Sequence, residues 1–172
     1  DNSASPATDE MIARCLAQYP VTAYKHINTG GNIGVAAGNN AGIKLSLADN
    51  CDHVLILNND IDIPQDYMFS QLVSLADEKG EAMIVPKIYY YGETKLWMAG
   101  GYMDEWRALG VHYGMNKEDS PAFNVAKHCT YSPTCFMLVK KEVFEKVGIM
   151  DERYFAYYDD TDFVLRATRL GY

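Results

Sequence analysis

Apolar runs and polar breaks alternate along this chain, and the pattern predicts strands interleaved with helices. Residues 54–57 form the clearest strand: four consecutive aliphatic side chains leave no polar face for water, so we expect burial on both faces. The small and apolar residues of 35–47 favour a helix packed closely on a sheet. We expect further strands at 21–24, 82–88 and 135–139, and further helices at 6–18, 64–80, 140–147 and 159–170.

Strands that alternate with helices predict an α/β fold, with a mainly parallel central sheet and helices on both faces. The segment from about 89 to 127 is rich in Gly, Tyr and Trp and has no clean period. We interpret it as a long irregular excursion with room for one hairpin, and loops of that length are often functional. At 172 residues, the whole of 1–172 is expected to be one domain.

The two ends of the chain look like interrupted elements. Ser5 suits a helix N-cap and Pro6 the first helical position, so residues 1–6 read as the end of a strand followed by a helix start. Gly171 and Tyr172 read as a helix end that leads into another strand. We therefore expect a fragment, truncated at both ends, that lacks the first and last strands of its sheet.

Composition narrows the function classes. Fifteen basic and twenty-three acidic residues give a net charge of -8, which argues against nucleic-acid binding because that needs clustered cations. The four cysteines form no CxxC pair, so neither a zinc site nor a disulfide framework is indicated, and a reducing compartment fits best. No apolar run is long enough for a membrane span and no leader is visible, so we expect a soluble chain.

A first acidic cluster follows strand 54–57, where Asn58 and Asn59 lead into Asp60 and Asp62. This places it at the carboxyl edge of the sheet, where open α/β folds bind ligands. Two carboxylates there suit a magnesium or manganese ion that keeps positions open for a diphosphate. The simpler alternative is a polar strand end with a turn at Pro64; we favour the metal site.

A second acidic cluster, Asp159, Asp160 and Asp162, opens the last helix. The helix dipole favours acids in a first turn, and capping explains one or two of them, but not three. Asp162 is expected to pair with Arg166 one turn later. The aromatic run 154–158 just before could partly dehydrate a carboxylate and stack on a sugar or base, which makes the cluster a candidate general base.

Other residues are weaker candidates. The glycines at 30, 31, 34 and 38 do not have the spacing of the dinucleotide-binding fingerprint, so tight turns and close helix packing explain them better. His112, between two glycines of the excursion, is the least ordinary of the four histidines, each of which is more simply structural or exposed. Trp97 and Trp106 are expected to belong to a local core.

Several segments together resemble one family. The chain is similar, over essentially its whole length, to the inverting family 2 glycosyltransferases of GT-A fold, particularly the rhamnosyltransferase-like members that build bacterial surface polysaccharides. Each motif is weak alone, but their common order makes the likeness specific. They are Asp1-Asn2-Ser3, residues 28–40, Leu57-Asn58-Asn59-Asp60, residues 154–163, Leu165-Arg166 and Gly171-Tyr172.

The resemblance implies roles for individual residues. Asp1 would contact the nucleotide base, and Asp60 would be the metal-binding acid of the DXD-type motif. Asp160 would be the catalytic aspartate, with Asp159 standing where the family usually has glutamate. The amides before Asp60 depart from a strict DXD, and Asp62 matches it only in a shifted register, so we assign Asp62 no metal. We also expect three asparagines to contact the nucleotide sugar: Asn32, Asn39 and Asn59. Asn32 and Asn39 are also typical of turns and helix starts.

The implied activity is transfer of a hexosyl or rhamnosyl group, with inversion, from a UDP- or dTDP-sugar to a glycan or lipid-linked acceptor. The reaction would use Mg²⁺ or Mn²⁺ and take place in the cytoplasm. Segments outside the chain would hold the protein at the inner face of the cell membrane. One alternative is a non-catalytic nucleotide-sugar or carbohydrate-binding module of the same fold. A nucleotidyltransferase is a further alternative, but it usually needs a phosphate loop rich in glycine and lysine near its start, which this sequence lacks.

Overall fold

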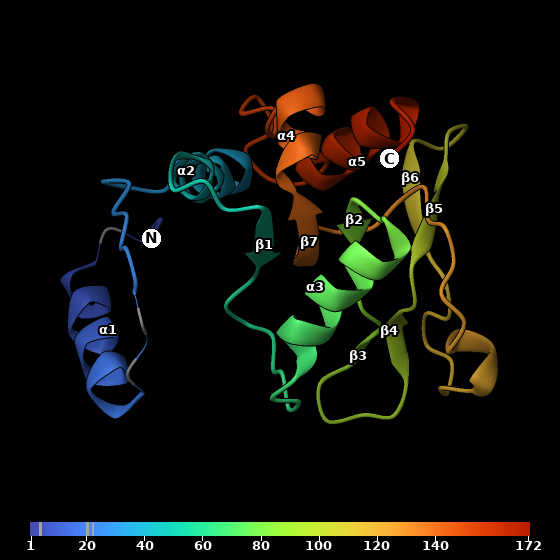
Figure 1. The fold of residues 1–172 in the computed structure, drawn as a ribbon, viewed down its shortest axis with the longest axis horizontal. Coiled ribbons are helices and arrows are strands. Elements are labelled where there is room, and N and C mark those ends of the chain that lie inside the picture. The colour runs from blue at the N-terminus through green and yellow to red at the C-terminus, as the bar shows by residue number, and fades with distance from the viewer. Residues whose placement is uncertain (4, 20, 22) are drawn as a thin grey trace.

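The computed structural model describes residues 1–3, 5–19, 21 and 23–172 (Figure 1). Its elements, in chain order, are α1 (Pro6–Gln18), α2 (Val35–Ala48), β1 (His53–Leu57), α3 (Met68–Lys79), β2 (Met83–Ile84), β3 (Ile88–Tyr89), β4 (Leu96–Met98), β5 (Gly101–Asp104), β6 (Leu109–His112), the 3-10 turn η1 (Pro121–Phe123), β7 (Phe136–Lys140), α4 (Lys141–Val147) and α5 (Asp159–Arg169). Among the described residues, no helix combines the length and hydropathy needed to cross a membrane.

The largest sheet of the described residues is antiparallel, so the prediction of a mainly parallel sheet is wrong for this part of the chain. Strand β7 lies between β1 and β2 and runs opposite to both, with Val139 opposite Val54 on one side and Met83 on the other. Strands β1 and β2 therefore run in the same direction, as the alternation of strand, helix and strand predicts. The direction of β7 is not visible in that alternation, because a long excursion separates it from β2.

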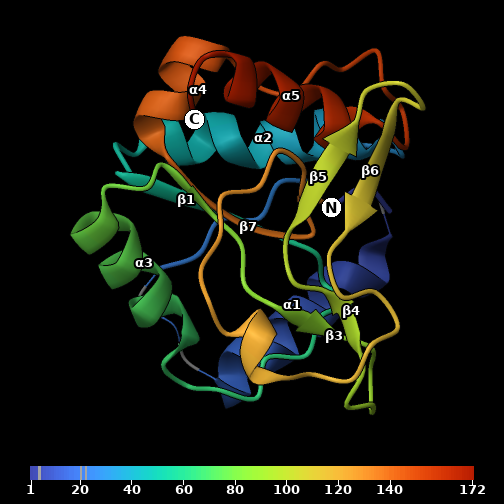
Figure 2. The ribbon, with the colours of Figure 1, turned by 90° about the vertical axis from the view of Figure 1, so that its right-hand side faces the viewer.

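Two hydrophobic clusters pack on opposite faces of β7, and they explain why the helices form two layers (Figure 2). Met137 and Val139 face α2, α4 and α5, where the stacked rings of Phe144 and Phe163 have centroids 5.7 Å apart. Phe136 and Leu138 face α3. Neighbouring residues of a strand point to opposite faces, so the continuous apolar run of β7 matches a strand covered on both sides.

Strand β1 is less covered than its sequence predicts. Val54 and Ile56 are buried, but Leu55 is half-buried and Leu57 is 41% exposed. The prediction of burial on both faces is therefore wrong for the second face of β1. The physical reason is that α3 covers only part of that face.

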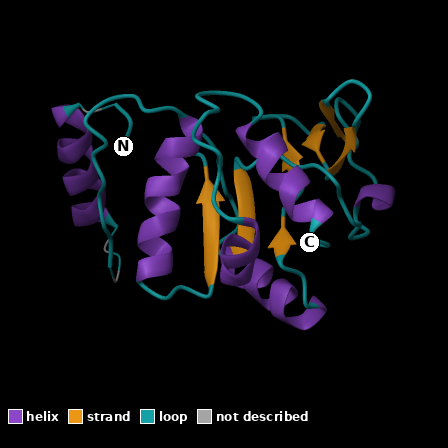
Figure 3. Cartoon of the chain, turned by 90° about the horizontal axis from the view of Figure 1, so that it is seen from above, coloured by secondary structure: helices purple, strands orange, loops and turns teal. Residues whose placement is uncertain are grey.

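The N-terminal helix α1 confirms the predicted start, since the Ser5 hydroxyl accepts the Ala7 N–H at 3.3 Å and Pro6 is the first helical residue. No residue of α1 is buried, and the helix lies at the outer edge of the molecule, with α2 between it and the strands (Figures 1 and 3). The strand expected at 21–24 is absent at 21, 23 and 24, and position 22 lies outside the described residues. No described strand pairs with this segment, so extended backbone there has no ladder to join.

The middle of the chain departs from prediction in detail. Helix α3 begins at Met68, after a turn at 66–67, and it ends as expected at Gly80 in the left-handed conformation. The strand expected at 82–88 is divided into β2 and β3 around Pro86, which has no N–H to give to a ladder. The excursion contains two hairpins, β3–β4 and β5–β6, where one was expected.

Candidate functional site

The first acidic cluster leaves the sheet at the end of β1. The Asn58 N–H donates to the Cys135 carbonyl at 2.8 Å, which ties the start of this segment to the chain just before β7. Asn59 and Asp60 follow and are both exposed. Asp60 is thus held close to the sheet by its neighbours while its carboxylate remains open to a ligand.

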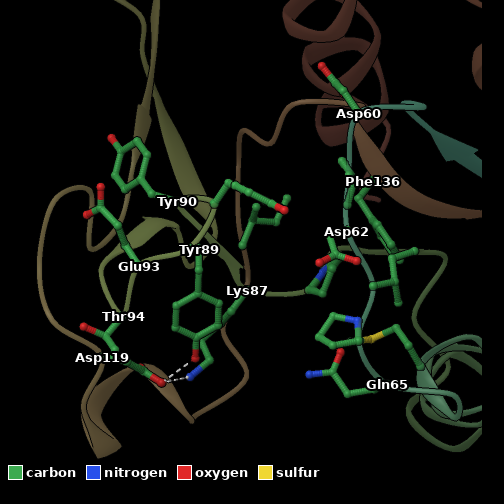
Figure 4. Close-up of a pocket in the computed structure, with 18 residues that line it drawn as sticks. Asp60, Asp62, Gln65, Lys87, Tyr89, Tyr90, Glu93, Thr94, Asp119 and Phe136 are labelled. Atoms are coloured by element: carbon green, nitrogen blue, oxygen red, sulfur yellow. Dashed lines mark hydrogen bonds and ion pairs between the residues drawn. The ribbon is translucent and has the colours of Figure 1, made fainter.

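Asp60 also stands at one end of a cleft of about 960 Å³ between the segment after β1 and the β3–β4 hairpin. Figure 4 shows the Asp60 carboxylate pointing away from the other labelled side chains, whereas Asp62 lies among them. The two carboxylates therefore face different surroundings. The metal contact that the resemblance implies for Asp60 stays a prediction.

The donor set around Asp60 can be compared with what divalent cations need. No group of three or more His, Cys, Asp or Glu side chains that could hold a metal ion occurs within the described part of the chain. Mg²⁺ commonly binds through one or two carboxylates, with substrate phosphates and water completing its shell. The exposed Asp60 fits an ion of that kind, completed by a phosphate ligand, and does not fit a cage made of protein side chains.

The second cluster lies at the N-terminus of α5, and its two leading aspartates differ in environment. Asp159 is only 5% exposed, and burial, together with the charge of Asp160, raises the pKa of Asp159 above its ordinary value. Asp160 is half-buried; its Oδ1 accepts the Thr161 N–H at 2.6 Å, and its Oδ2 accepts the Tyr131 hydroxyl at 3.4 Å. Of the two, Asp160 is the carboxylate with the greater access to a ligand.

Asp162 takes the structural role that its spacing predicts. Its carboxylate accepts the Arg166 Nε–H at 2.8 Å, one turn along α5. The same guanidinium donates to the carbonyls of Val147 and Ile149, at 2.8 and 2.9 Å, and so joins α5 to the end of α4. Asp162 is therefore occupied in holding the helix in place.

Tyr131 is a site residue that the sequence does not reveal. Its ring stacks on His112, with centroids 5.8 Å apart and an interplanar angle of 15°, and its hydroxyl reaches Asp160. Gly110 leaves room for this ring, because a Cβ at position 110 would lie 2.2 Å from ring carbons of Tyr131. The signal in the sequence was the pair of glycines around His112, which makes space for an aromatic side chain from another segment.

The contacts of His112 give it a structural role. Its Nδ1 lies 3.3 Å from the Trp97 carbonyl, and the Trp97 ring meets it edge-on at 4.6 Å. Burial lowers the pKa of His112, although the Trp97 hydrogen bond and the charge of Asp160 act in the opposite direction. A neutral His112 supports Tyr131 as a flat stacking partner.

The two tryptophans were expected in a local core, and only Trp97 is partly covered. Trp106 is 100% exposed, so the prediction is wrong there. Trp106 lies in the turn between β5 and β6, and that hairpin carries it away from the packed residues.

Cys135 relates the two acidic clusters to each other. Burial raises the pKa of its thiol to about 11, and the negative charges of Asp160 and Asp60 contribute to the same shift. The contacts agree: the Tyr131 hydroxyl reaches Asp160, and the Cys135 carbonyl accepts the N–H of Asn58, two residues before Asp60. The clusters that the sequence singled out face one region of the molecule.

The glycine-rich segment before α2 joins two further motifs. The Asn2 side-chain amide donates to the Gly34 carbonyl at 2.8 Å, and the Val35 N–H donates to the Phe155 carbonyl at 2.8 Å. Gly34 has φ +89°, and a Cβ there would lie 2.6 Å from the Phe155 carbonyl oxygen. The N-terminal residues, the start of α2 and the aromatic run before α5 therefore meet at one point.

Asp1 is held in place beside this junction. Its Oδ1 accepts the backbone and hydroxyl of Ser3 at 2.8 and 2.6 Å. Its Oδ2 is buried, lies 3.8 Å from Nε2 of His26, and has no hydrogen-bond partner among the described residues. Within that part of the chain, one buried carboxylate oxygen is thus left without a donor.

The four asparagines near the two clusters divide into structural and open positions. Asn32 caps a turn, with its Oδ1 accepting the Gly34 N–H at 3.0 Å, and Asn39 donates to the Met150 sulfur at 3.6 Å. Asn59 is exposed beside Asp60. Asn40, which the sequence did not single out, is fully buried and bonded to the backbone of Met150 and the side chain of Glu152.

Comparison with known proteins shows the family of the chain. The family model described as glycosyl transferase family 2 matches residues 1–148. The low-salt glycan biosynthesis hexosyltransferase Agl10 of Haloferax volcanii is 29% identical over 154 residues, which cover 84% of this chain and 46% of that protein. The chain thus spans about half the length of this relative. Because the family match extends over most of the chain, the protein belongs to glycosyl transferase family 2, whose members have a GT-A type α/β fold and transfer sugars.

Proposed function

We propose that the protein transfers a hexosyl or rhamnosyl group, with inversion, from a UDP- or dTDP-sugar to a glycan or lipid-linked acceptor in the synthesis of cell-surface polysaccharide. The supporting observation is that the chain just before β7 contacts both acidic clusters: the Tyr131 hydroxyl donates to Asp160, and the Cys135 carbonyl accepts the N–H of Asn58, two residues before Asp60. It means that a donor bound at Asp60 and an acceptor bound at Asp160 would lie near each other. The hexosyltransferase name of the Haloferax relative is consistent with this choice.

Asp160 is the proposed general base. Its Oδ2 has one hydrogen bond, from Tyr131, and a carboxylate oxygen can accept more than one. An acceptor hydroxyl bound there would give its proton to Asp160 while its oxygen attacks the anomeric carbon. The bond from that carbon to the diphosphate breaks on the opposite face, so a single displacement inverts the configuration without an enzyme-bound intermediate.

Asp60 is the proposed protein ligand of a Mg²⁺ or Mn²⁺ ion. When bound, such an ion supplies positive charge against the diphosphate that leaves. The Oδ2 of Asp1, which has no partner, is a proposed contact for a donor group of the nucleotide base. The remaining proposed contacts of the nucleotide sugar are Asn32, Asn39 and Asn59. A lipid-linked acceptor would place the reaction at the cytoplasmic face of the membrane.

The test uses the full-length protein with a panel of UDP- and dTDP-sugars, with and without Mn²⁺. Thermal shift identifies the donor that binds, and release of nucleoside diphosphate measures turnover. We expect Asp160→Asn to reduce turnover by at least about a hundredfold, as loss of a general base does, with donor affinity unchanged. Asp66→Asn, a change at an exposed aspartate outside the cleft, is the control.

Two outcomes oppose the proposal in different ways. Unchanged turnover in Asp160→Asn removes that residue from the role of base. Donor binding without any turnover by the wild-type protein favours the alternative, a non-catalytic nucleotide-sugar or carbohydrate-binding module of the same fold.

A further inference from the structure

Of the residues that line the cleft beside Asp60, only Asp60 itself has a role in the mechanism above. One wall is the segment from Asp60 to Gln65 and the other is the stretch from Pro86 to Thr94, which includes β3. Met68, Asp119 and Phe136 complete the lining. Its volume of about 960 Å³ is within the range of pockets that enclose small organic ligands. Figure 4 shows the two walls facing each other across the opening.

The lining combines aromatic surface with hydrogen-bonding groups. Three consecutive tyrosines, 89 to 91, come from one wall, and two of them are well exposed, Tyr89 at 42% and Tyr91 at 89%. Exposed aromatic faces can pack against the C–H faces of sugar rings. Carboxylates accept hydrogen bonds from hydroxyls, and the Gln65 amide can both donate and accept. These groups suit a ligand that is rich in hydroxyls.

The charge of the cleft selects against phosphate. Lys87 is the single cation among the described residues that line it, and Lys87 already donates to Asp119 at 2.7 Å and to Asn124 at 2.6 Å. The Tyr89 hydroxyl donates to the same Asp119 at 2.6 Å. Apart from Asp60, the proposed cation ligand at the edge of the cleft, the other charged lining residues are the acids Asp62 and Glu93. A phosphate or an acidic sugar would meet net negative charge here, whereas a neutral saccharide would not.

The cleft begins where the proposed transfer takes place. Asp60 borders it, and Phe136 in its lining follows Cys135, whose carbonyl accepts the N–H of Asn58 at 2.8 Å. We propose that this cleft binds the acceptor through one or more neutral sugar units next to the hydroxyl that receives the transferred sugar. This inference rests on the proposed function, and it assigns the acceptor, whereas the residues discussed before concern the donor and the base.

The direct test is calorimetric titration of the full-length protein with neutral di- to tetrasaccharides built from glucose, galactose, mannose or rhamnose. A uronic-acid disaccharide provides the charge comparison. The double variant Gln65→Ala, Tyr91→Ala removes one polar and one aromatic group. Within the described residues, neither side chain makes a hydrogen bond or a ring contact. Tyr24→Ala, at a tyrosine 60% exposed and outside the cleft, is the matched control.

We expect at least one neutral saccharide to bind, and its Kd and its KM as acceptor to rise about tenfold in the double variant and stay unchanged in the control. The KM for the donor and the rate of donor hydrolysis should not change. Failure of every neutral saccharide to bind, tighter binding of the uronic-acid probe, or a rise in donor KM alone would each overturn the inference. If the wild-type protein neither binds a donor nor turns it over, the proposed function is overturned. The saccharide titration would still test the cleft.

Discussion

Removal of the Tyr131 hydroxyl is expected to slow turnover without weakening donor binding. Burial, the negative charge of Asp160 and the hydrogen bond to Asp160 raise the pKa of Tyr131, so the phenol stays protonated and donates to Asp160. In Tyr131→Phe the carboxylate loses a donor that fixes one of its oxygens, while the ring can still stack on His112.

The size of the effect follows from the geometry. Hydrogen bonds to charged groups contribute about 1.5–3 kcal/mol, and one near the outer limit of length contributes less. At 3.4 Å, the Tyr131 bond is of that longer kind. We therefore take about 1 kcal/mol, which corresponds to roughly a fivefold lower kcat.

A substitution in a different segment should break the same hydrogen bond. In Gly110→Ala the new Cβ would lie 2.2 Å from the Tyr131 ring, so the ring must move and its hydroxyl leaves Asp160. We expect a similar loss of kcat. Because both changes remove one interaction, the double variant should be no slower than Gly110→Ala alone.

The assay is steady-state release of nucleoside diphosphate, with kcat and donor KM measured separately and thermal unfolding as the check on folding. The control is Tyr113→Phe, next to the same hairpin, because the Tyr113 hydroxyl makes no hydrogen bond within the described residues. An unchanged kcat in Tyr131→Phe, or a loss that appears only in donor KM, would refute the positioning of Asp160 by this phenol. Additive losses in the double variant would show that Gly110 acts through something else.

Three further changes test the frame around the site. Asn40→Ala leaves the N–H and carbonyl of Met150 without their partner and should lower the free energy of unfolding by about 3 kcal/mol in urea titrations; a loss below about 1 kcal/mol would contradict this. Burial raises the pKa of Asp159, so its charged form destabilises the fold once the pH exceeds 3.8. Asp159→Asn should raise Tm at pH 7 by an amount that shrinks toward pH 3.8, and a gain independent of pH would contradict the cause. Gly34→Ala forces a side chain into φ +89° and against Phe155, so we expect a lower Tm and weaker donor binding by thermal shift; unchanged values would mean that the junction adapts.

Features with a local cause were predictable from the sequence. The Ser5 cap of α1, the end of α3 at Gly80 and the pairing of Asp162 with Arg166 each depend on residues within about one helical turn. For the same reason the Asn32 turn follows from its own sequence, since its side chain bonds two residues ahead. Such contacts form wherever the backbone takes the predicted local shape.

Features with a distant cause were not predictable. The direction of β7 depends on how the excursion crosses the sheet, and the exposure of Trp106 depends on where the β5–β6 hairpin points. Tyr131 has a place in the candidate site only because Gly110, from another segment, leaves room for its ring. Hydrophobicity along the chain records that a residue is apolar, but it does not record which distant segment will cover it.

The position of β7 between β1 and β2 also sets the order in which the protein can fold. Val54 pairs with Val139 across 85 positions of the chain, so this pairing must wait until a long loop has closed. Until β7 arrives, β1 and β2 each present an unpaired edge. Folding limited by such distant contacts is slow, and the waiting edges favour association with other chains. During synthesis, the sheet of this glycosyltransferase cannot be completed before residues 136–140 have left the ribosome.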